Sequence, residues 1–144
     1  MTGDEGRSRP ETIVYIDYSD IRDGKVDELR AGVLGLVAFV EAHEPQLIAY
    51  GFYLDEEADR MTVVAVHPDS ASLELHMEVG GPEFRKLAHL ISLRSIEVYG
   101  HVGDRALQVL EQKAAMLGDG GRVVVREPSA GFGRVLRPRR SEGV

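Results

Sequence analysis

The chain has 144 residues, of which 43% are hydrophobic and 28% charged, a balance that fits one compact domain with a hydrophobic core. It contains no cysteine, which excludes disulfides, thiolate metal sites, iron–sulfur clusters and a cysteine nucleophile. The net charge is −7, although residues 128–144 carry four arginines against one glutamate, so the acidic excess belongs to the rest of the chain. Because an acidic body repels phosphate backbones, we expect the domain to bind no nucleic acid.

The ends of the chain give no sign of membrane targeting. No apolar run is long enough to span a bilayer, and the first residues are acidic and glycine-rich rather than basic and then apolar. We therefore expect a cytoplasmic protein without a membrane partner. Residues 1–11 are predicted to be disordered, residues 12–127 to form the folded domain, and residues 128–144 to be a basic flexible tail. Docking of this tail on an acidic partner is the alternative to a purely solvated end.

The first half of the chain predicts a strand, a helix and two further strands. Residues 12–18 (TIVYIDY) form a strand whose two alternating sets of side chains are both apolar. Hydrophobic residues then recur at three- and four-residue spacing, which predicts a helix that begins after the Asp23-Gly24 cap and ends near His43. Residues 46–54 and 60–67 predict two antiparallel strands around a polar connection.

The second half predicts two helical regions and two strands. These are a helix capped by Asp69 or Ser70 and broken at Gly80-Gly81-Pro82, a strand at residues 93–102, a helix capped by Asp104 and closed by Gly118, and a strand at residues 122–126. The order β-α-β-β-α-β is that of the ferredoxin-like antiparallel sheet, here with an extra C-terminal α-β unit.

The apolar character of the predicted strands on both faces indicates a partner subunit. Helices in this topology cover only one face of the sheet, so a second apolar face needs another cover. A second copy of the same sheet is the simplest one, since two-fold homodimers are the commonest assemblies. We predict an obligate homodimer, and we leave open whether the fifth strand crosses to the partner.

Three segments resemble a known family: DGKVDELR at residues 23–30, EAHEPQLIAYGFYLD at 41–55 and DSASLELHMEVGGPEFRKL at 69–87. Through them, residues 12–102 resemble the antibiotic biosynthesis monooxygenase-like proteins, which are dimeric α/β barrels. The resemblance implies a cavity between sheet and helices in each subunit, with a histidine at the place of His76 pointing into it.

The resemblance also implies a type of chemistry. Cofactor-free quinol oxygenases of this family deprotonate a phenol, and the electron-rich anion reacts directly with oxygen. Haem-degrading relatives instead use the histidine as an iron ligand, together with an asparagine and a tryptophan. This chain contains neither Asn nor Trp, which argues against haem degradation.

His76 is the main catalytic candidate, because the unperturbed pKa of imidazole lies near neutrality and suits a general base. The alternative is a hydrogen-bonded core histidine. His67, just before Pro68, is predicted to face His76 across the cavity mouth, the alternative being a strand-end histidine half in water. The remaining candidates for substrate binding are Tyr50, Tyr53, Phe84, Arg94 and Tyr99. Which face of the sheet each strand residue takes depends on the register of the strands.

These observations lead to two functional hypotheses. The first is a cofactor-independent monooxygenase that acts on a phenolic or quinol-like aromatic molecule, with no cofactor and no metal. His67 and His76 supply only two nitrogens, without a metal-binding spacing. The second is a non-catalytic ligand-binding or stress-associated dimer in which His76 is structural. The Gly80-Gly81 break is either a lid beside the cavity or a simple turn.

Overall fold

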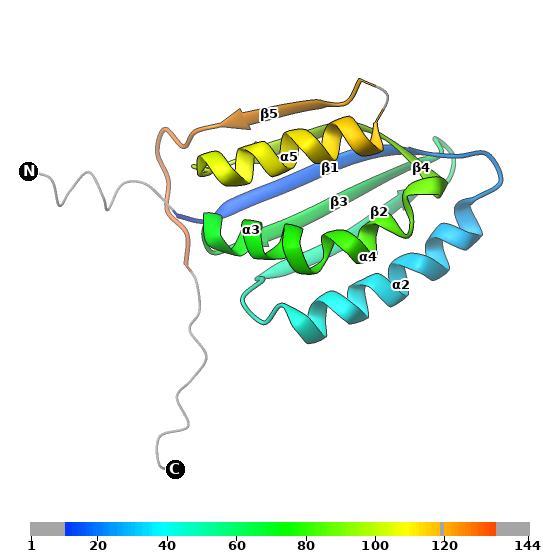
Figure 1. Ribbon diagram of the computed structural model, residues 1–144, viewed down its shortest axis with the longest axis horizontal. Coiled ribbons are helices and arrows are strands. Elements are labelled where there is room, and N and C mark those ends of the chain that lie inside the picture. Colours follow the sequence, from blue (N-terminus) through cyan, green and yellow to red (C-terminus); the bar gives the residue numbers. More distant parts are fainter. Residues whose placement is uncertain (1–10, 119, 135–144) are drawn as a thin grey trace, which may run out of the picture.

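The computed structural model describes residues 11–118 and 120–134, and these form one five-stranded sheet with helices on one side (Figure 1). The strands are β1 (Ile13–Ile21), β2 (Ala49–Asp55), β3 (Arg60–His67), β4 (Ile91–Tyr99) and β5 (Arg122–Arg126). The helices are α2 (Val26–His43), α3 (Ser70–Val79), α4 (Gly81–Arg85), the 3-10 turn η1 (Ala88–Leu90) and α5 (Asp104–Leu117).

The strand order β2-β3-β1-β4-β5 confirms the predicted ferredoxin-like sheet with an added α-β unit. The first four strands pair antiparallel, and β5 pairs parallel to β4 at the edge of the sheet. The parallel pairing requires a crossover, and α5 supplies it. Within the one chain described, β5 pairs with β4 over Arg122–Arg126.

Some predicted boundaries were wrong, and local geometry explains them. The fourth strand ends at Tyr99 rather than at residue 102, because Gly100 has a φ of 144° that extended strands do not adopt. Helix α2 has Lys25 at its N-cap and no side-chain cap. Asp104 is the first residue of α5 and not its cap. The Asp69 cap is confirmed, since its carboxylate accepts a hydrogen bond from the Ser72 N–H at 2.9 Å.

The two faces of the sheet differ in their cover. Helices α2, α3, α4 and α5 all lie over the same side, which we call the covered face (Figure 1). Alternate residues of β1 point to that face and are at most 3% exposed, namely Ile13, Tyr15, Asp17, Ser19 and Ile21. Most of the covered side chains form two hydrophobic clusters between sheet and helices.

The other side, which we call the open face, has no helix over it in the described part of the chain. Its centre is apolar, because Val14 of β1 pairs with Val66 of β3, and Ile16 pairs with Val64. Tyr18 at the same face is 37% exposed. Within one chain β1 is therefore well buried on one side only, and the homodimer that would bury the other side remains a prediction.

The described ends of the chain can be compared with the predicted boundaries of the folded domain, residues 12–127. Residues 1–10 and 135–144, which include most of the predicted disordered segment and tail, lie outside the described residues. A Cβ atom at Gly133 would lie 2.5 Å from Thr12 Oγ1, so the start of the predicted tail lies against the start of β1. No described helix combines the length and the apolar character that a membrane span needs.

Candidate functional site

His76 forms a buried pair with Glu44. The His76 Nδ1 atom lies 2.8 and 3.0 Å from the two carboxylate oxygens of Glu44, and the two residues are only 6% and 2% exposed. An ionised carboxylate can only accept hydrogen bonds, so Nδ1 carries the hydrogen and donates it. In the neutral ring, Nε2 then carries the free lone pair. The pair is arranged as a general base held by a carboxylate.

Three local features bring this pair together. Glu44 caps the C-terminal end of α2, just before Pro45, and His76 lies in the last turn of α3. A Cβ atom at Gly80 would lie 2.9 Å from Glu44 Oε2 and 3.0 Å from His76 Cε1. Glycine at position 80 therefore makes room for the pair, while its φ of −82° is open to any residue.

The Gly80-Gly81 break changes the direction of the chain little. Gly80 N–H donates to the His76 carbonyl at 2.8 Å, and Phe84 N–H donates to the Gly80 carbonyl at 2.9 Å. Both are hydrogen bonds of the helical i to i+4 type, so α3 continues almost directly into α4 (Figure 1). This continuity brings Phe84 to the same side as His76.

His67 lies beside His76 in the interior. Their ring centroids are 5.5 Å apart, and His67 is 0% exposed rather than half in water. Its Nδ1 lies 2.8 Å from Ser72 Oγ, while its Nε2 is buried with no hydrogen-bond partner among the described residues. Burial and the neighbouring His76 lower the pKa of His67 to about 3, so its ring is neutral near pH 7.

Aromatic rings fill the space around the pair. The Tyr50 ring lies 5.2 Å from the His76 ring and 5.1 Å from Phe52, and Phe52 stacks on Phe84 at 6.5 Å. Burial raises the pKa of Tyr50, and the carboxylates of Asp17 and Glu44 raise it further. The Tyr50 hydroxyl is therefore protonated at neutral pH. Of the sequence candidates, the structure brings His67, Tyr50 and Phe84 to the His76 side.

The other three candidates lie on the open face, away from His76. Tyr53 is 61% exposed and Tyr99 38% exposed, and the Tyr99 hydroxyl donates to Glu97 at 2.7 Å. Arg94 forms an exposed ion pair with Asp20 at 3.4 Å. Side chains alternate along a strand, so Tyr50 and Tyr53, three residues apart on β2, point to opposite faces.

A second buried polar cluster was missed by the sequence interpretation. Tyr15 OH donates to Asp17 Oδ2 at 2.5 Å, and Lys113 Nζ donates to Tyr15 OH at 2.8 Å and lies 3.4 Å from Asp17 Oδ2. The Asp17 side chain is 0% exposed and that of Lys113 is 14% exposed. Burial lowers the pKa of Lys113 and raises the pKa of Tyr15 well above its usual value.

The sequence carried a signal for part of this cluster. Asp17 alternates with Ile13 and Tyr15, which is the pattern of a charged side chain on a buried strand face. Lys113 lies three residues after Leu110 on the apolar stripe of α5. Nothing in the sequence marks Glu44, because its partner His76 is 32 residues away.

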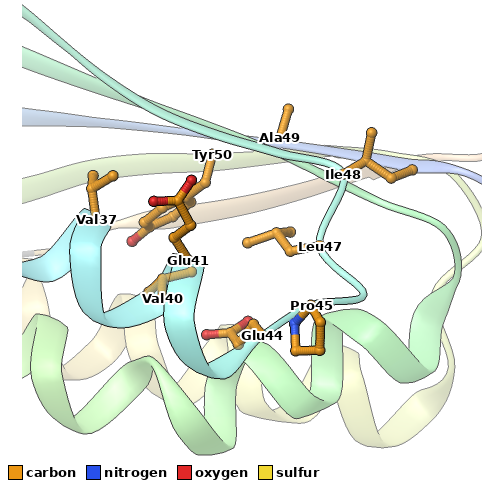
Figure 2. Close-up of a pocket in the computed structure, with 9 residues that line it drawn as sticks. All are labelled: Val37, Val40, Glu41, Glu44, Pro45, Leu47, Ile48, Ala49 and Tyr50. Carbon is orange, nitrogen blue, oxygen red and sulfur yellow. The ribbon is translucent and has the colours of Figure 1, made fainter. Parts of the chain in front are cut away.

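Two hollows lie on either side of the His76–Glu44 pair. The larger, of about 280 Å³, lies between the end of α2 and the start of β2, where Figure 2 shows Leu47 and Tyr50 opposite Val37 and Glu41. Glu44 forms part of its wall.

The smaller hollow has a volume of about 80 Å³ and lies between α3–α4 and α5. His76, Phe84 and Lys113 line it, and Met77 and Met116 are among its other residues. It therefore combines a base, an aromatic ring and two cations, since Arg85 also lines it. In the part of the chain that the structure describes, no group of three or more His, Asp or Glu side chains is placed to hold a metal ion.

Comparisons with known proteins identify the fold. No family model and no curated protein sequence matches the chain. Among solved structures, MupZ from Pseudomonas fluorescens aligns with a TM-score of 0.67 at 20% identity, over 88% of this chain and 99% of MupZ. A Caulobacter crescentus protein, provisionally assigned as an antibiotic biosynthesis monooxygenase, aligns with a TM-score of 0.57 at 18% identity, over 70% of this chain and 99% of its own. This chain has the antibiotic biosynthesis monooxygenase-like fold.

The monooxygenase-like fold is shared with a structure of SnoaB, a cofactor-independent oxygenase from Streptomyces nogalater. SnoaB aligns with a TM-score of 0.53 at 13% identity, over 62% of this chain and 93% of its own. The MupZ alignment covers 88% of the 144 residues, which is more than residues 1–102 contain. It therefore includes part of the chain after Val102. At these identities the likeness concerns the fold alone, and the predicted resemblance is confirmed at that level.

Proposed function

We propose that this chain is a homodimeric, cofactor-independent monooxygenase that acts on a phenolic or quinol-like aromatic molecule, with His76 as its base. The observation that carries the proposal is the buried His76–Glu44 pair, whose Nδ1···O distances are 2.8 and 3.0 Å. A carboxylate that holds Nδ1–H leaves Nε2 to accept a proton, and His76 lines a hollow beside an aromatic ring. The shared fold with SnoaB, a cofactor-independent oxygenase, supports the same reaction class.

The proposed reaction balances without a cofactor. His76 Nε2 takes the phenolic proton, and Glu44 stabilises the imidazolium that forms. The phenolate passes one electron to O₂, and the resulting radical and superoxide combine at a ring carbon that carries a hydrogen. The imidazolium returns its proton to the peroxide, which loses water and leaves a carbonyl. One oxygen atom of O₂ enters the quinone product and the other leaves as water.

The dimeric state is the second part of the proposal. Val14, Ile16, Val64 and Val66 form an apolar patch at the centre of the open face. A second copy of the same face would bury this patch, as packed sheets do at a spacing of about 10 Å. The helix-covered side, with the catalytic pair, would then face away from the partner.

Oxygen uptake by the purified, metal-stripped protein tests the reaction. A panel of hydroquinones and naphthols is offered to the parent protein and to His76→Ala and Glu44→Gln. We expect uptake by the parent and a loss of roughly 10²- to 10⁴-fold in rate for His76→Ala, the usual contribution of a general base. Glu41→Gln is the matched control, because Glu41 also lines the larger hollow but is exposed. Uptake no greater than that of buffer on every substrate would contradict the proposal.

The size of the smaller hollow favours a second candidate function. At about 80 Å³ it is below the roughly 300–1,000 Å³ of ordinary ligand pockets. A protein that binds a small ligand without transforming it, with His76 in a structural role, fits this volume. Binding of a panel member without oxygen uptake, unchanged by His76→Ala, would favour this candidate over the oxygenase.

A further inference from the structure

The smaller hollow is lined by two cations that the proposed reaction has not yet used, the exposed Arg85 and the largely buried Lys113. Lys113 of α5 reaches the hollow that His76 and Phe84 line from the other side. Its Nζ atom lies 4.4 Å from the centroid of the Phe84 ring and 5.0 Å from that of Tyr15. The ammonium group is therefore held over aromatic faces, in contact with the space next to the base.

The hydrogen bonds of Lys113 leave it able to bind a further group. An ammonium has three donors, and the described contacts are to Tyr15 OH at 2.8 Å and Asp17 Oδ2 at 3.4 Å. Both contacts lie on the sheet side of the lysine. Because the side chain is 14% exposed and lines the hollow, its third donor is open to a ligand there.

We infer that Lys113 binds the ionised oxygen of the aromatic substrate, so that the hollow selects phenols that are held as their phenolates. The inference rests on the proposed oxygenase reaction and names its substrate class. In that reaction a negative charge appears on the phenolic oxygen when His76 takes the proton. A cation fixed in a largely dry site stabilises such a charge strongly, because little water competes for it.

The flexible side chains of the hollow can make room for a ring. Met77 of α3 and Met116 of α5 are both among its lining residues, and Met116 is 61% exposed. Methionine is unbranched and repacks at low cost around a ligand. An aromatic ring between these side chains and Phe84 would have its oxygen near Lys113.

A purely structural role for Lys113 gives a different expectation. In that role the lysine only neutralises the buried Asp17, and the pair offers no net charge to a ligand. The Lys113 Nζ atom lies closer to the neutral Tyr15 hydroxyl, at 2.8 Å, than to Asp17 Oδ2, at 3.4 Å, so the carboxylate is not the only group that holds the ammonium. The two roles are separated by the pKa of a bound phenol, because an ion pair without net charge would not lower it.

The pKa of bound para-nitrophenol is a direct measure of this site, because its phenolate absorbs visible light and needs no turnover. In the full-length parent protein we expect the pKa of the bound ligand to fall by about one unit or more, as for an acid beside a cation. The double variant Asp17→Asn/Lys113→Met, which removes both charges and leaves no buried ion alone, should raise the pKa of the bound ligand by about one unit or more above its value in the parent protein.

Two controls accompany the titration. Para-nitroanisole, the methyl ether, cannot ionise and should bind parent and double variant with similar affinity. Lys86→Met removes an exposed lysine of similar size and should leave the pKa of bound para-nitrophenol unchanged.

The outcomes separate this inference from the proposed reaction. Equal pKa values for the ligand bound to parent and double variant, or no binding of para-nitrophenol at millimolar concentration, would overturn the inference even if oxygen is consumed. A lowered pKa that depends on Lys113, in a protein that consumes no oxygen on any phenol, would support the anion site and overturn the oxygenase.

Discussion

Each face of the sheet contains side chains that its environment does not favour: buried polar groups on the covered face, and exposed apolar groups on the open face. The covered face contains Asp17, Ser19 and His67, each 0% exposed, whereas the open face presents Val14 and Val64 without a helix over them. Burying a charge is costly unless it is paired, so the polar groups inside indicate positions kept for more than packing. An uncovered apolar face indicates that one subunit is incomplete. The proposed catalytic site and the proposed dimer interface therefore lie on opposite sides of the same strands.

The largest expected effect comes from placing a charge on the open face. Val64→Asp would put a carboxylate at the centre of the patch that the proposed dimer buries. An unpaired buried charge costs about 3 kcal/mol or more, and a two-fold dimer would bury two of them, so we expect the variant to be monomeric. Sedimentation velocity at micromolar concentration measures the state of both proteins.

The matched control for this variant is Leu34→Asp. Leu34 lies on α2, away from the open face, and is 71% exposed. This variant tests whether replacing any exposed apolar residue by an acidic one changes the oligomeric state. If the parent protein sediments as a monomer, the proposed dimer is wrong. The exposed apolar patch of the open face would then need another explanation.

The next effect is a loss of stability in acid that depends on His67. Its pKa is about 3 when folded and about 6.5 in the unfolded chain, so between these values the unfolded state binds more protons. The free energy of unfolding should therefore fall as the pH drops from about 6.5 to 3, by an amount on the order of 4 kcal/mol. Urea unfolding followed across this range gives the slope.

Replacement of the imidazole tests the source of that slope. His67→Gln keeps polar atoms at the site but does not titrate, so most of the acid-dependent loss should disappear. His43→Gln, at an exposed position of α2, should retain the slope of the parent. If His67→Gln kept the full slope, another buried group would be responsible.

A smaller effect is expected from the glycine beside the His76–Glu44 pair. Gly80→Ala places a methyl group 2.9 Å from the carboxylate and 3.0 Å from the imidazole, so the pair must move apart. Overpacking of this kind costs about 1–3 kcal/mol, and the rate of oxygen uptake should fall with it. Gly81→Ala has no atom within 4 Å of the added carbon and should be as stable as the parent or more so. Equal behaviour of the two variants would mean that the pair tolerates the displacement.

The smallest effect concerns the helix that carries His76 to the covered face. Asp69→Ala removes the side-chain hydrogen bond to Ser72 N–H and should cost about 1 kcal/mol of stability. Asp104→Ala is the comparison, because Asp104 makes no capping hydrogen bond in α5. Thermal unfolding of both variants should rank Asp69→Ala as the less stable, and the reverse order would argue against the cap.

Local patterns were enough to predict the fold, whereas the site depends on contacts that no local pattern encodes. Strand alternation and helical periodicity placed β3 and β5 at the observed residues, since each depends on neighbours in the chain. The pairing of His76 with Glu44 joins the ends of α2 and α3, and only tertiary packing creates it.

The register of the strands decided the remaining site candidates. Sequence reasoning offered Arg94 as the cation for an anionic substrate, but β4 places it on the open face with Asp20. The cation beside His76 is Lys113, from a helix that the family resemblance did not cover. The spacing of its apolar residues predicted α5 as an amphipathic helix. A single lysine within the apolar stripe does not by itself indicate a binding site.

The position of Lys113 suggests how proteins of this fold change their ligand specificity during evolution. The proton-accepting pair belongs to the end of α2 and to α3, while the cation belongs to α5, the helix that connects β4 to the edge strand β5. In the proposed site, the base and the cation therefore come from different segments of the chain. Residues 103–126 could be grafted onto a related protein that has only the four-stranded core. Such a graft would transfer the preference for acidic ligands and leave the catalytic base unchanged.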